Sequence, residues 1–174
     1  MNPKLLILPQ ALAVIALGLS AGWYLGLSNE VVPALNQLEA ATYIQVQQKL
    51  DQSTQNWGYT ALFFAATLMP FIAAGLAAFK SQRRTALFWL LVALLHFLGV
   101  YWVSIVTNLP IQQDMMQWSA TAPPADWQSL RATWATGNSI RTIAEIICFI
   151  SALILIIRRD TIANSTFARH SHRQ

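Results

Sequence analysis

Four long apolar stretches constrain the fold of this chain more than any other feature of its sequence. At a rise of about 1.5 Å per residue, helices of these lengths would reach roughly 29–35 Å, enough to cross a hydrocarbon core of about 30 Å. Because backbone groups in lipid must be hydrogen-bonded within the protein, the stretches are predicted to be helices. We therefore expect an all-α fold, a four-transmembrane-helix bundle embedded in a lipid bilayer. The four stretches are residues 5–27, 59–79, 85–107 and 139–157.

The first stretch also permits a second interpretation, a signal peptide with Lys4 in its charged region. The apolar core of a signal peptide covers only about 7–15 residues, and this stretch is much longer. Gly18, Gly22 and Gly26 form two overlapping small-xxx-small steps, which are typical of a helix-packing surface in a membrane. We therefore expect the first stretch to belong to the bundle.

Composition supports a membrane protein and weakens other classes. Only 10% of the residues are charged, whereas soluble domains have about 25%, so too little charge is present to cover a soluble globule. The formal net charge of +4 is too small an excess to favour a nucleic-acid partner. The single cysteine, Cys148, excludes an internal disulfide and a cysteine metal cluster.

The basic residues predict the orientation of the bundle. Only Lys49, Arg131 and Arg141 lie on the side of segments 28–58 and 108–138, and the other eight lie on the opposite side. By the positive-inside rule, both termini are expected to be cytoplasmic, with a bacterial inner membrane as the expected location. Residues 1–159 are predicted to form one integral membrane domain, followed by a polar cytoplasmic tail over 160–174. The eight residues are Lys4, Lys80, Arg83, Arg84, Arg158, Arg159, Arg169 and Arg173.

The two outward-facing segments are predicted to contain short amphipathic helices that cover the bundle. Apolar residues recur with a helical period over 31–50, and Pro33 suits a first helical turn. In the second segment, Asp126 is expected to cap a short helix. Trp127, Leu130 and Trp134 share one face of that helix. Six of the seven tryptophans lie at or beyond the outer ends of the stretches, which also indicates an outer layer of protein.

Ionisable residues inside a membrane indicate a functional site. His96 lies near the middle of the third stretch, and Arg141 and Glu145 lie in the first turns of the fourth. Asn138 and Thr142 share the helical face of Arg141 and Glu145, at steps of i, i+3, i+4 and i+7.

The third stretch contributes further polar groups to the expected site. Thr107 shares a helical face with His96, and Asn108 follows directly. The simplest packing directs this face and the polar face of the fourth stretch inward, which predicts a polar pocket beneath an aromatic lid.

Each of these residues also has a purely structural interpretation. Arg141 and Glu145 could neutralise each other at i, i+4. Gly137 and Asn138 could end the short outer helix, with Asn138 as the N-cap of the next, and Asn108 could be a C-cap before Pro110. A single His96 could form one hydrogen bond between helices.

A metal or haem centre has little support in the sequence. The predicted spans contain one histidine, one thiol and no H-x-x-x-H or H-E-x-x-H spacing. Haem bound by His96 alone is a weaker alternative. We expect neither a metal nor a cofactor.

The order of several motifs resembles the anthrone oxygenase-like family of small four-helix membrane proteins, over about residues 12–157. The most specific part is N-x-P followed by W-x-x-x-N-x-x-R-[ST]. The chain departs from the family pattern at two places. Gln112 stands where the family usually has a second Asn after N-x-P, and no Asn shortly follows Gln47. The motifs are Gly18–Gly22, Val32–Leu35, Tyr43-Ile44, Gln47, Thr107–Ile111, Trp134 and Asn138–Thr142.

The resemblance implies an oxygenase that converts anthrones to anthraquinones with dioxygen, without a metal or flavin. Such a reaction needs a base, groups that stabilise an oxyanion, and a dry aromatic pocket. The catalytic candidates are Glu145 or His96 as the base, with Arg141, Asn138 and Asn108 at the oxyanion. The candidates for binding a flat apolar substrate are Trp127, Trp134, Thr107, Thr142 and Gln47.

Two other hypotheses remain open at this point. The protein could bind a lipid, a quinone or a partner protein without catalysis, and the departure at Gln112 favours that interpretation. It could also be a transporter or channel, but the inner halves of the stretches are apolar and offer no polar path to both faces.

Overall fold

The computed structural model describes the backbone of residues 4–171 and the side chains of residues 7–158. This part of the chain contains four helical runs that are long and apolar enough to cross a membrane, so the predicted all-α four-helix bundle is confirmed. The runs cover Ile7–Leu35, Trp57–Phe79, Arg83–Met115 and Trp127–Arg158.

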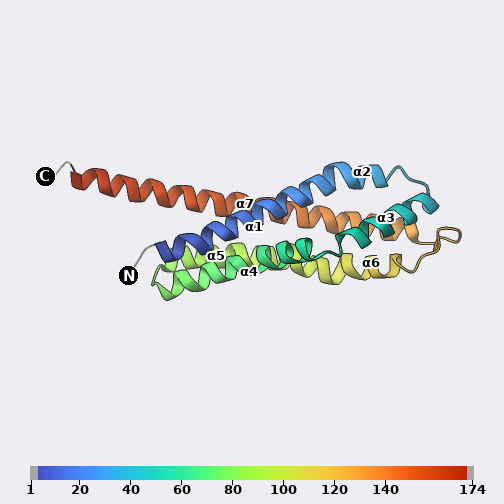
Figure 1. Cartoon of the computed structure of the whole chain (residues 1–174), viewed down its shortest axis with the longest axis horizontal. Coiled ribbons are helices and arrows are strands. Elements are labelled where there is room, and N and C mark those ends of the chain that lie inside the picture. Colours follow the sequence, from blue (N-terminus) through green and yellow to red (C-terminus); the bar gives the residue numbers. More distant parts are fainter. Residues whose placement is uncertain (1–3, 172–174) are drawn as a thin grey trace.

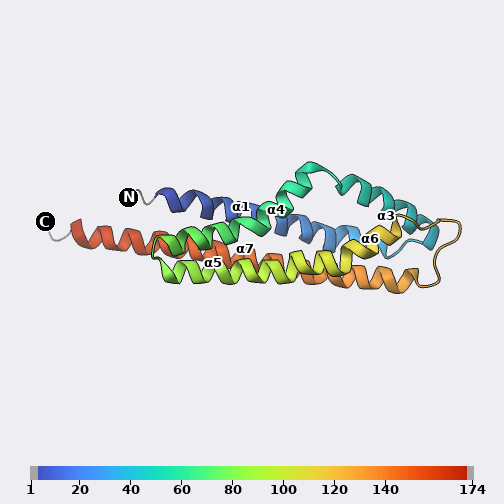
Figure 2. The same ribbon diagram turned by 90° about the horizontal axis from the view of Figure 1, so that it is seen from below.

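The membrane helices lie side by side along one axis (Figures 1 and 2). The start of α1 and the end of α7 lie at the same end of the molecule, together with the turn between α4 and α5 (Figure 1). These helices are α1 (Lys4–Gly26), α4 (Trp57–Phe79), α5 (Arg83–His96) and α7 (Trp127–Ser171).

A second group of short helices gathers at the opposite end of the bundle (Figure 2). It consists of α2 (Val32–Leu35), α3 (Ala40–Thr54) and α6 (Leu109–Met115), beside the first turns of α7. Side chains of these elements share one apolar cluster that includes Leu35, Ile44, Met115 and Trp134. This cluster is the layer of protein that the tryptophan distribution predicts.

Small residues allow the membrane helices to approach closely. The core of the bundle is rich in alanine, including Ala13, Ala66 and Ala152, as expected where helices pack in lipid. A Cβ atom on Gly18 would lie 2.8 Å from the ring of Phe149, so this glycine serves helix packing as predicted.

The helix-packing role that we predicted for Gly22 and Gly26 is wrong. A Cβ atom on Gly22 or Gly26 would meet nothing within 4 Å. Both residues line a cavity instead of a neighbouring helix. The glycine spacing thus identifies one face of α1, but it does not decide whether that face meets a neighbouring helix or a cavity.

The helical repeat predicted over residues 31–50 is divided between two helices. The first membrane helix continues through the π-helix η1 (Leu27–Val31) and α2, and a turn then leads to α3. Glu39 has extended backbone angles and begins α3. The apolar repeat crosses the break without interruption because residues on both sides of the turn pack into the same cluster.

The third membrane helix does not end at Asn108. The interpretation of Asn108 as a C-cap is therefore also wrong. The helix continues through the π-helices η2 (Phe97–Trp102) and η3 (Ser104–Asn108) into α6. The wider turn lets the N–H of Leu109 bond to the carbonyl of Ser104, five residues earlier. Pro110 follows directly as the second residue of α6, just after the π-helical turn.

Helix α7 runs through Gly137 and Asn138 without a break, so the predicted stop and the N-cap at Asn138 are wrong. Gly137 serves a close approach instead, because a Cβ atom there would collide with the side-chain amide of Asn108. The helix begins at Trp127, directly after Asp126, and continues to Ser171. The last three residues of the predicted tail and the side chains of its other residues lie outside the described part.

Candidate functional site

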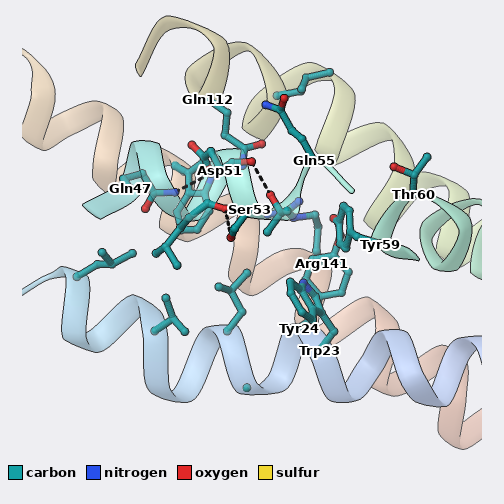
Figure 3. A pocket seen from close by; sticks show the side chains of 18 of the residues that line it. Trp23, Tyr24, Gln47, Asp51, Ser53, Gln55, Tyr59, Thr60, Gln112 and Arg141 are labelled. Carbon is teal, nitrogen blue, oxygen red and sulfur yellow. Dashed lines mark hydrogen bonds between the residues drawn. The ribbon is translucent and has the colours of Figure 1, made fainter. Parts of the chain in front are cut away.

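A cavity of about 560 Å³ lies between the membrane helices and the outer layer. Residues from α1, η1, α2, α3, α4, α6 and α7 line it, and they include a cluster of aromatic and polar side chains (Figure 3). The aromatic residues are Trp23, Tyr24, Tyr59 and Trp134. A concave apolar site with a few convergent polar groups is the usual form of a small-molecule site.

Asp51 on α3 provides a buried carboxylate on the cavity wall. Its oxygen Oδ1 accepts hydrogen bonds from the side-chain amides of Gln47 at 3.0 Å and Gln112 at 2.9 Å. Its second oxygen, Oδ2, is buried and has no hydrogen-bond partner within the described part of the chain. Burial raises the pKa of Asp51 above its usual value of 3.8, and the hydrogen bonds from Gln112 and Gln47 oppose that rise.

Arg141 on α7 lines the same cavity and is only 5% exposed. Its guanidinium donates to Ser104 Oγ and to Asn138 Oδ1, both at 3.2 Å. It also lies over the ring of Tyr24, 5.0 Å from the ring centroid. Among the residues whose side chains the structure describes, Arg141 forms no salt bridge with a carboxylate.

The predicted i, i+4 neutralisation of Arg141 by Glu145 is therefore wrong. Glu145 Oε1 lies 3.0 Å from His96 Nε2 and also accepts a hydrogen bond from the hydroxyl of Ser20. The side chains of His96 and Glu145 are fully buried in the bundle, and neither residue lines the cavity. The hydrogen bond predicted for His96 between helices is confirmed, with Glu145 as its partner.

Asn138 and Thr142 support the wall behind Arg141 and do not line the cavity. The amide of Asn138 donates to Ser28 Oγ at 2.7 Å. That oxygen lies 2.6 Å from the hydroxyl oxygen of Thr142. Together, these contacts join α7 to η1 and fix the side chain that accepts from the Arg141 guanidinium.

Asn108 and Trp134 meet where the third membrane helix contacts α7. Asn108 donates its amide to the backbone carbonyl of Trp134 at 2.9 Å. Trp134 lines the cavity, and its buried indole N–H has no hydrogen-bond partner in the described part of the chain. Asn108 lies behind it, outside the lining.

The two remaining sequence candidates lie away from the cavity. Trp127 packs against Tyr43, with their ring centroids 5.7 Å apart, and against the guanidinium of Arg131 at 4.7 Å. Thr107 is half-buried and is not part of the lining. Gln47, Trp134 and Arg141 are thus the predicted site residues that share the cavity.

Several residues that line this cavity were not predicted from the sequence, and the most important of them is Asp51. Gln47 and Asp51 are one helical turn apart, a spacing that could have identified a polar face on α3. Gln112 stood out only as a departure from the family pattern. No sequence pattern identified Tyr24 and Tyr59 as site residues. In the structure their hydroxyl oxygens lie 3.3 Å apart, and the guanidinium of Arg141 lies over the ring of Tyr24.

The residues with described side chains contain no group of three or more His, Cys, Asp or Glu residues that could hold a metal ion. The family model described as anthrone oxygenase matches residues 54–151, more than half of the chain. No curated protein and no solved structure matches the chain. The matched region includes the third and fourth membrane helices with Asn108, Trp134 and Arg141, and the chain belongs to the anthrone oxygenase family.

Proposed function

We propose that this membrane protein is a cofactor-independent oxygenase that oxidises an apolar cyclic phenolic substrate with dioxygen. One observation carries the proposal beyond family membership. Arg141 places a buried guanidinium, without a carboxylate partner among the described side chains, on the wall of an aromatic cavity. A buried cation is costly unless a negative charge compensates it. A substrate that becomes an anion during the reaction supplies that charge.

The proposed reaction proceeds through such an anion. A base removes a proton from an acidic C–H bond of a cyclic ketone, and the electron pair remains as an enolate. Dioxygen forms a C–O bond at the deprotonated carbon and, after protonation, gives a hydroperoxide. The O–O bond and the remaining C–H bond then break, water leaves, and a second carbonyl forms. One oxygen atom stays in the quinone and the other ends in water, so carbon is oxidised and dioxygen is reduced.

Arg141 is the group that stabilises the enolate oxygen in this proposal. Hydrogen bonds from fixed donors are most effective at a developing charge when the donors need no rearrangement. Ser104 and Asn138 hold the guanidinium through its two terminal nitrogens, while its Nε–H has no hydrogen-bond partner among the described residues. Trp134 supplies an aromatic surface to the same cavity, and its buried indole N–H has no hydrogen-bond partner among the described residues.

The other candidates act indirectly in this arrangement. Asn138 and Thr142 fix the position of Arg141, and Asn108 fixes the helix that carries Trp134. His96 and Glu145 lie outside the cavity lining.

Oxygen uptake and quinone absorbance test this function directly. The purified protein, reconstituted in lipid nanodiscs, is supplied with emodin anthrone under air. We expect a rate above that of the uncatalysed reaction, and a loss of about 100-fold in Arg141→Gln, comparable to the removal of an oxyanion donor. Arg84→Gln, which removes an exposed arginine at the far end of the bundle, is the matched control.

Two outcomes would contradict the proposal. The first is the absence of catalysis by the wild-type protein, in which case binding of the same substrate would favour the non-catalytic alternative, a receptor for a quinone, lipid or similar apolar molecule. The second is full activity in Arg141→Gln.

We also propose that the end of the bundle bearing Arg83 and Arg84 is cytoplasmic, in a bacterial inner membrane. Both residues are exposed at the turn between α4 and α5. The positive-inside rule favours this orientation. Single cysteines placed at residues 82 and 55 in a Cys148→Ala background test it. An impermeant thiol reagent applied to intact cells should label only position 55, and labelling of position 82 alone would reverse the orientation.

A further inference from the structure

We infer that Asp51 is the base that removes the substrate proton, and that Gln47 and Gln112 are positioning residues that bind one of its oxygens and leave the other free to accept the proton. This inference rests on the proposed oxygenase function. It assigns the catalytic base to a residue that neither the sequence motifs nor the family resemblance indicates.

The hydrogen bonds of Asp51 distinguish its two oxygen atoms. Both glutamine amides donate to Oδ1, at 3.0 Å from Gln47 and 2.9 Å from Gln112. Oδ2 is buried and has no hydrogen-bond partner among the residues that the structure describes, and the residue lines the cavity. The lone pairs of Oδ2 are therefore the free basic site of a carboxylate that is only 5% exposed.

The competing carboxylate is poorly placed for the same role. Glu145 is fully buried and, like Asp51, has one oxygen without a hydrogen-bond partner among the described residues, while its Oε1 contacts both His96 and Ser20. It does not line the cavity, and neither does His96. A general base must come within hydrogen-bond reach of the proton that it removes, which favours Asp51 on geometry alone.

The two glutamines approach Asp51 from different elements. Gln47 precedes it by one turn of α3, whereas Gln112 reaches it from α6, which is 61 residues away in the sequence. Two donors on one oxygen fix the plane of the carboxyl group. They also favour its ionised form, which burial disfavours, so the group can accept a proton and still be ionised at the start of the reaction.

Charges around the cavity complete this arrangement. The other titratable residues in the lining are Tyr24, Glu30, Tyr59 and Arg141. Tyr43 on α3 also interacts electrostatically with Asp51, while Arg131 faces the ring of Tyr43. Asp51 and Arg141 are thus the two buried groups of the lining that can carry opposite charges, and no salt bridge joins them among the described side chains.

The proton and electron balance follows from these positions. Asp51 Oδ2 forms an O–H bond as the substrate C–H bond breaks, and the C–H electron pair becomes the enolate beside Arg141. After dioxygen binds to the carbon, Asp51 returns the proton to the outer peroxide oxygen. The carboxylate is regenerated, and loss of water completes the oxidation without a further reactant.

Deuterium exchange without oxygen isolates the proton step. Anthrone in deuterated buffer is mixed with the protein in nanodiscs under anaerobic conditions, and incorporation at the acidic carbon is followed by NMR. We expect the wild-type protein to accelerate exchange and Asp51→Asn to lower the protein-dependent rate by about 100-fold or more, the usual contribution of a general base. Asp114→Asn, an exposed carboxylate on α6, should exchange as the wild type does.

The controls separate this inference from the proposed function. The assignment of Asp51 is overturned if Asp51→Asn exchanges at the wild-type rate. It is also overturned if Glu145→Gln loses exchange while Asp51→Asn keeps it, and both conclusions hold even if oxygen uptake continues. If exchange depends on Asp51 but the protein takes up no oxygen, the assignment of Asp51 as the base is supported and the proposed oxygenase function is overturned. Asp51→Glu checks folding, since it retains a carboxylate and should restore part of the exchange.

The role of Gln112 has its own readout. Gln112→Met removes one donor from Oδ1, so the pKa of Asp51 should rise and the acid limb of the pH profile of exchange should move to higher pH. A purely structural role would lower the rate without moving the limb, and that result overturns the positioning assignment. Gln117→Met, at an exposed position beyond α6, is the control.

Discussion

The side-chain amide of Asn108 donates to the backbone carbonyl of Trp134 at 2.9 Å, and this contact joins the third membrane helix to α7. The contact depends on Gly137, because a Cβ atom there would collide with Asn108. A buried hydrogen bond and a glycine together thus fix the helix that carries Trp134 and Arg141.

Gly137→Ala should destabilise the protein. The added methyl group overfills the contact with Asn108, at a cost of about 1–3 kcal/mol. Thermal unfolding in detergent measures the effect. Gly75→Ala is the control, because a Cβ atom on Gly75 meets nothing within 4 Å and alanine favours a helix over glycine. Equal stability of the two variants would contradict the close approach.

A double-mutant cycle should detect the pair formed by His96 and Glu145. Residues that share a buried hydrogen bond usually show a coupling energy of about 0.5–3 kcal/mol. We expect a coupling in this range for His96→Leu with Glu145→Gln, and a smaller one for Arg141→Gln with Glu145→Gln. A larger coupling in the second cycle would favour the i, i+4 ion pair.

Gly22→Leu should impair ligand binding without unfolding the protein. The new side chain enters the cavity, where a Cβ atom meets nothing within 4 Å. We expect the dissociation constant for a stable anthraquinone to rise by about tenfold or more, equivalent to about 1.4 kcal/mol. Equilibrium dialysis measures the constant. Gly75→Leu introduces the same side chain outside the cavity, and an equal effect there would refute the cavity as the binding site.

Asp51→Asn should stabilise the protein increasingly as the pH rises. Burial raises the pKa of Asp51 above 3.8 in the folded state, so the folded protein retains a proton that the unfolded chain has lost. The contribution of Asp51 to the free energy of unfolding is then greatest below pH 3.8, and it is lost as the pH rises through the folded-state pKa. An asparagine does not ionise and avoids this loss.

The difference in unfolding midpoint between Asp51→Asn and the wild type, measured from acid to neutral pH, tests this sign. Taking a difference removes the contributions of groups that both proteins share. Asp114→Asn, at an exposed position, is the control. A difference that stays constant or decreases with pH would contradict a raised pKa.

Much of the architecture could be predicted from the sequence. Long apolar stretches have few alternatives in lipid, so the four membrane helices followed from length and hydropathy. The outer layer followed from the tryptophans and the apolar repeats. Arg141 was conspicuous because a cation within an apolar stretch is costly, and its place at the cavity agrees with that argument.

The local interpretation of single residues was less successful. Gly137, Asn138 and Asn108 have the residue types of helix ends, yet all three lie within continuous helices. Their role depends on a neighbour that local sequence does not reveal. Gly137 meets Asn108 across the helix interface, so the close approach explains the glycine better than a break does.

The sequence by itself determined which segments cross the membrane and which faces are polar. Only the tertiary structure decided which polar groups meet: Asp51 with Gln112, Glu145 with His96, and Arg141 with no carboxylate among the described side chains. The physical reason is that periodicity reports the burial of a helical face within one segment. Hydrogen-bond partners depend on the rotation and separation of helices that are distant in sequence, and those are set by the packing of the whole bundle.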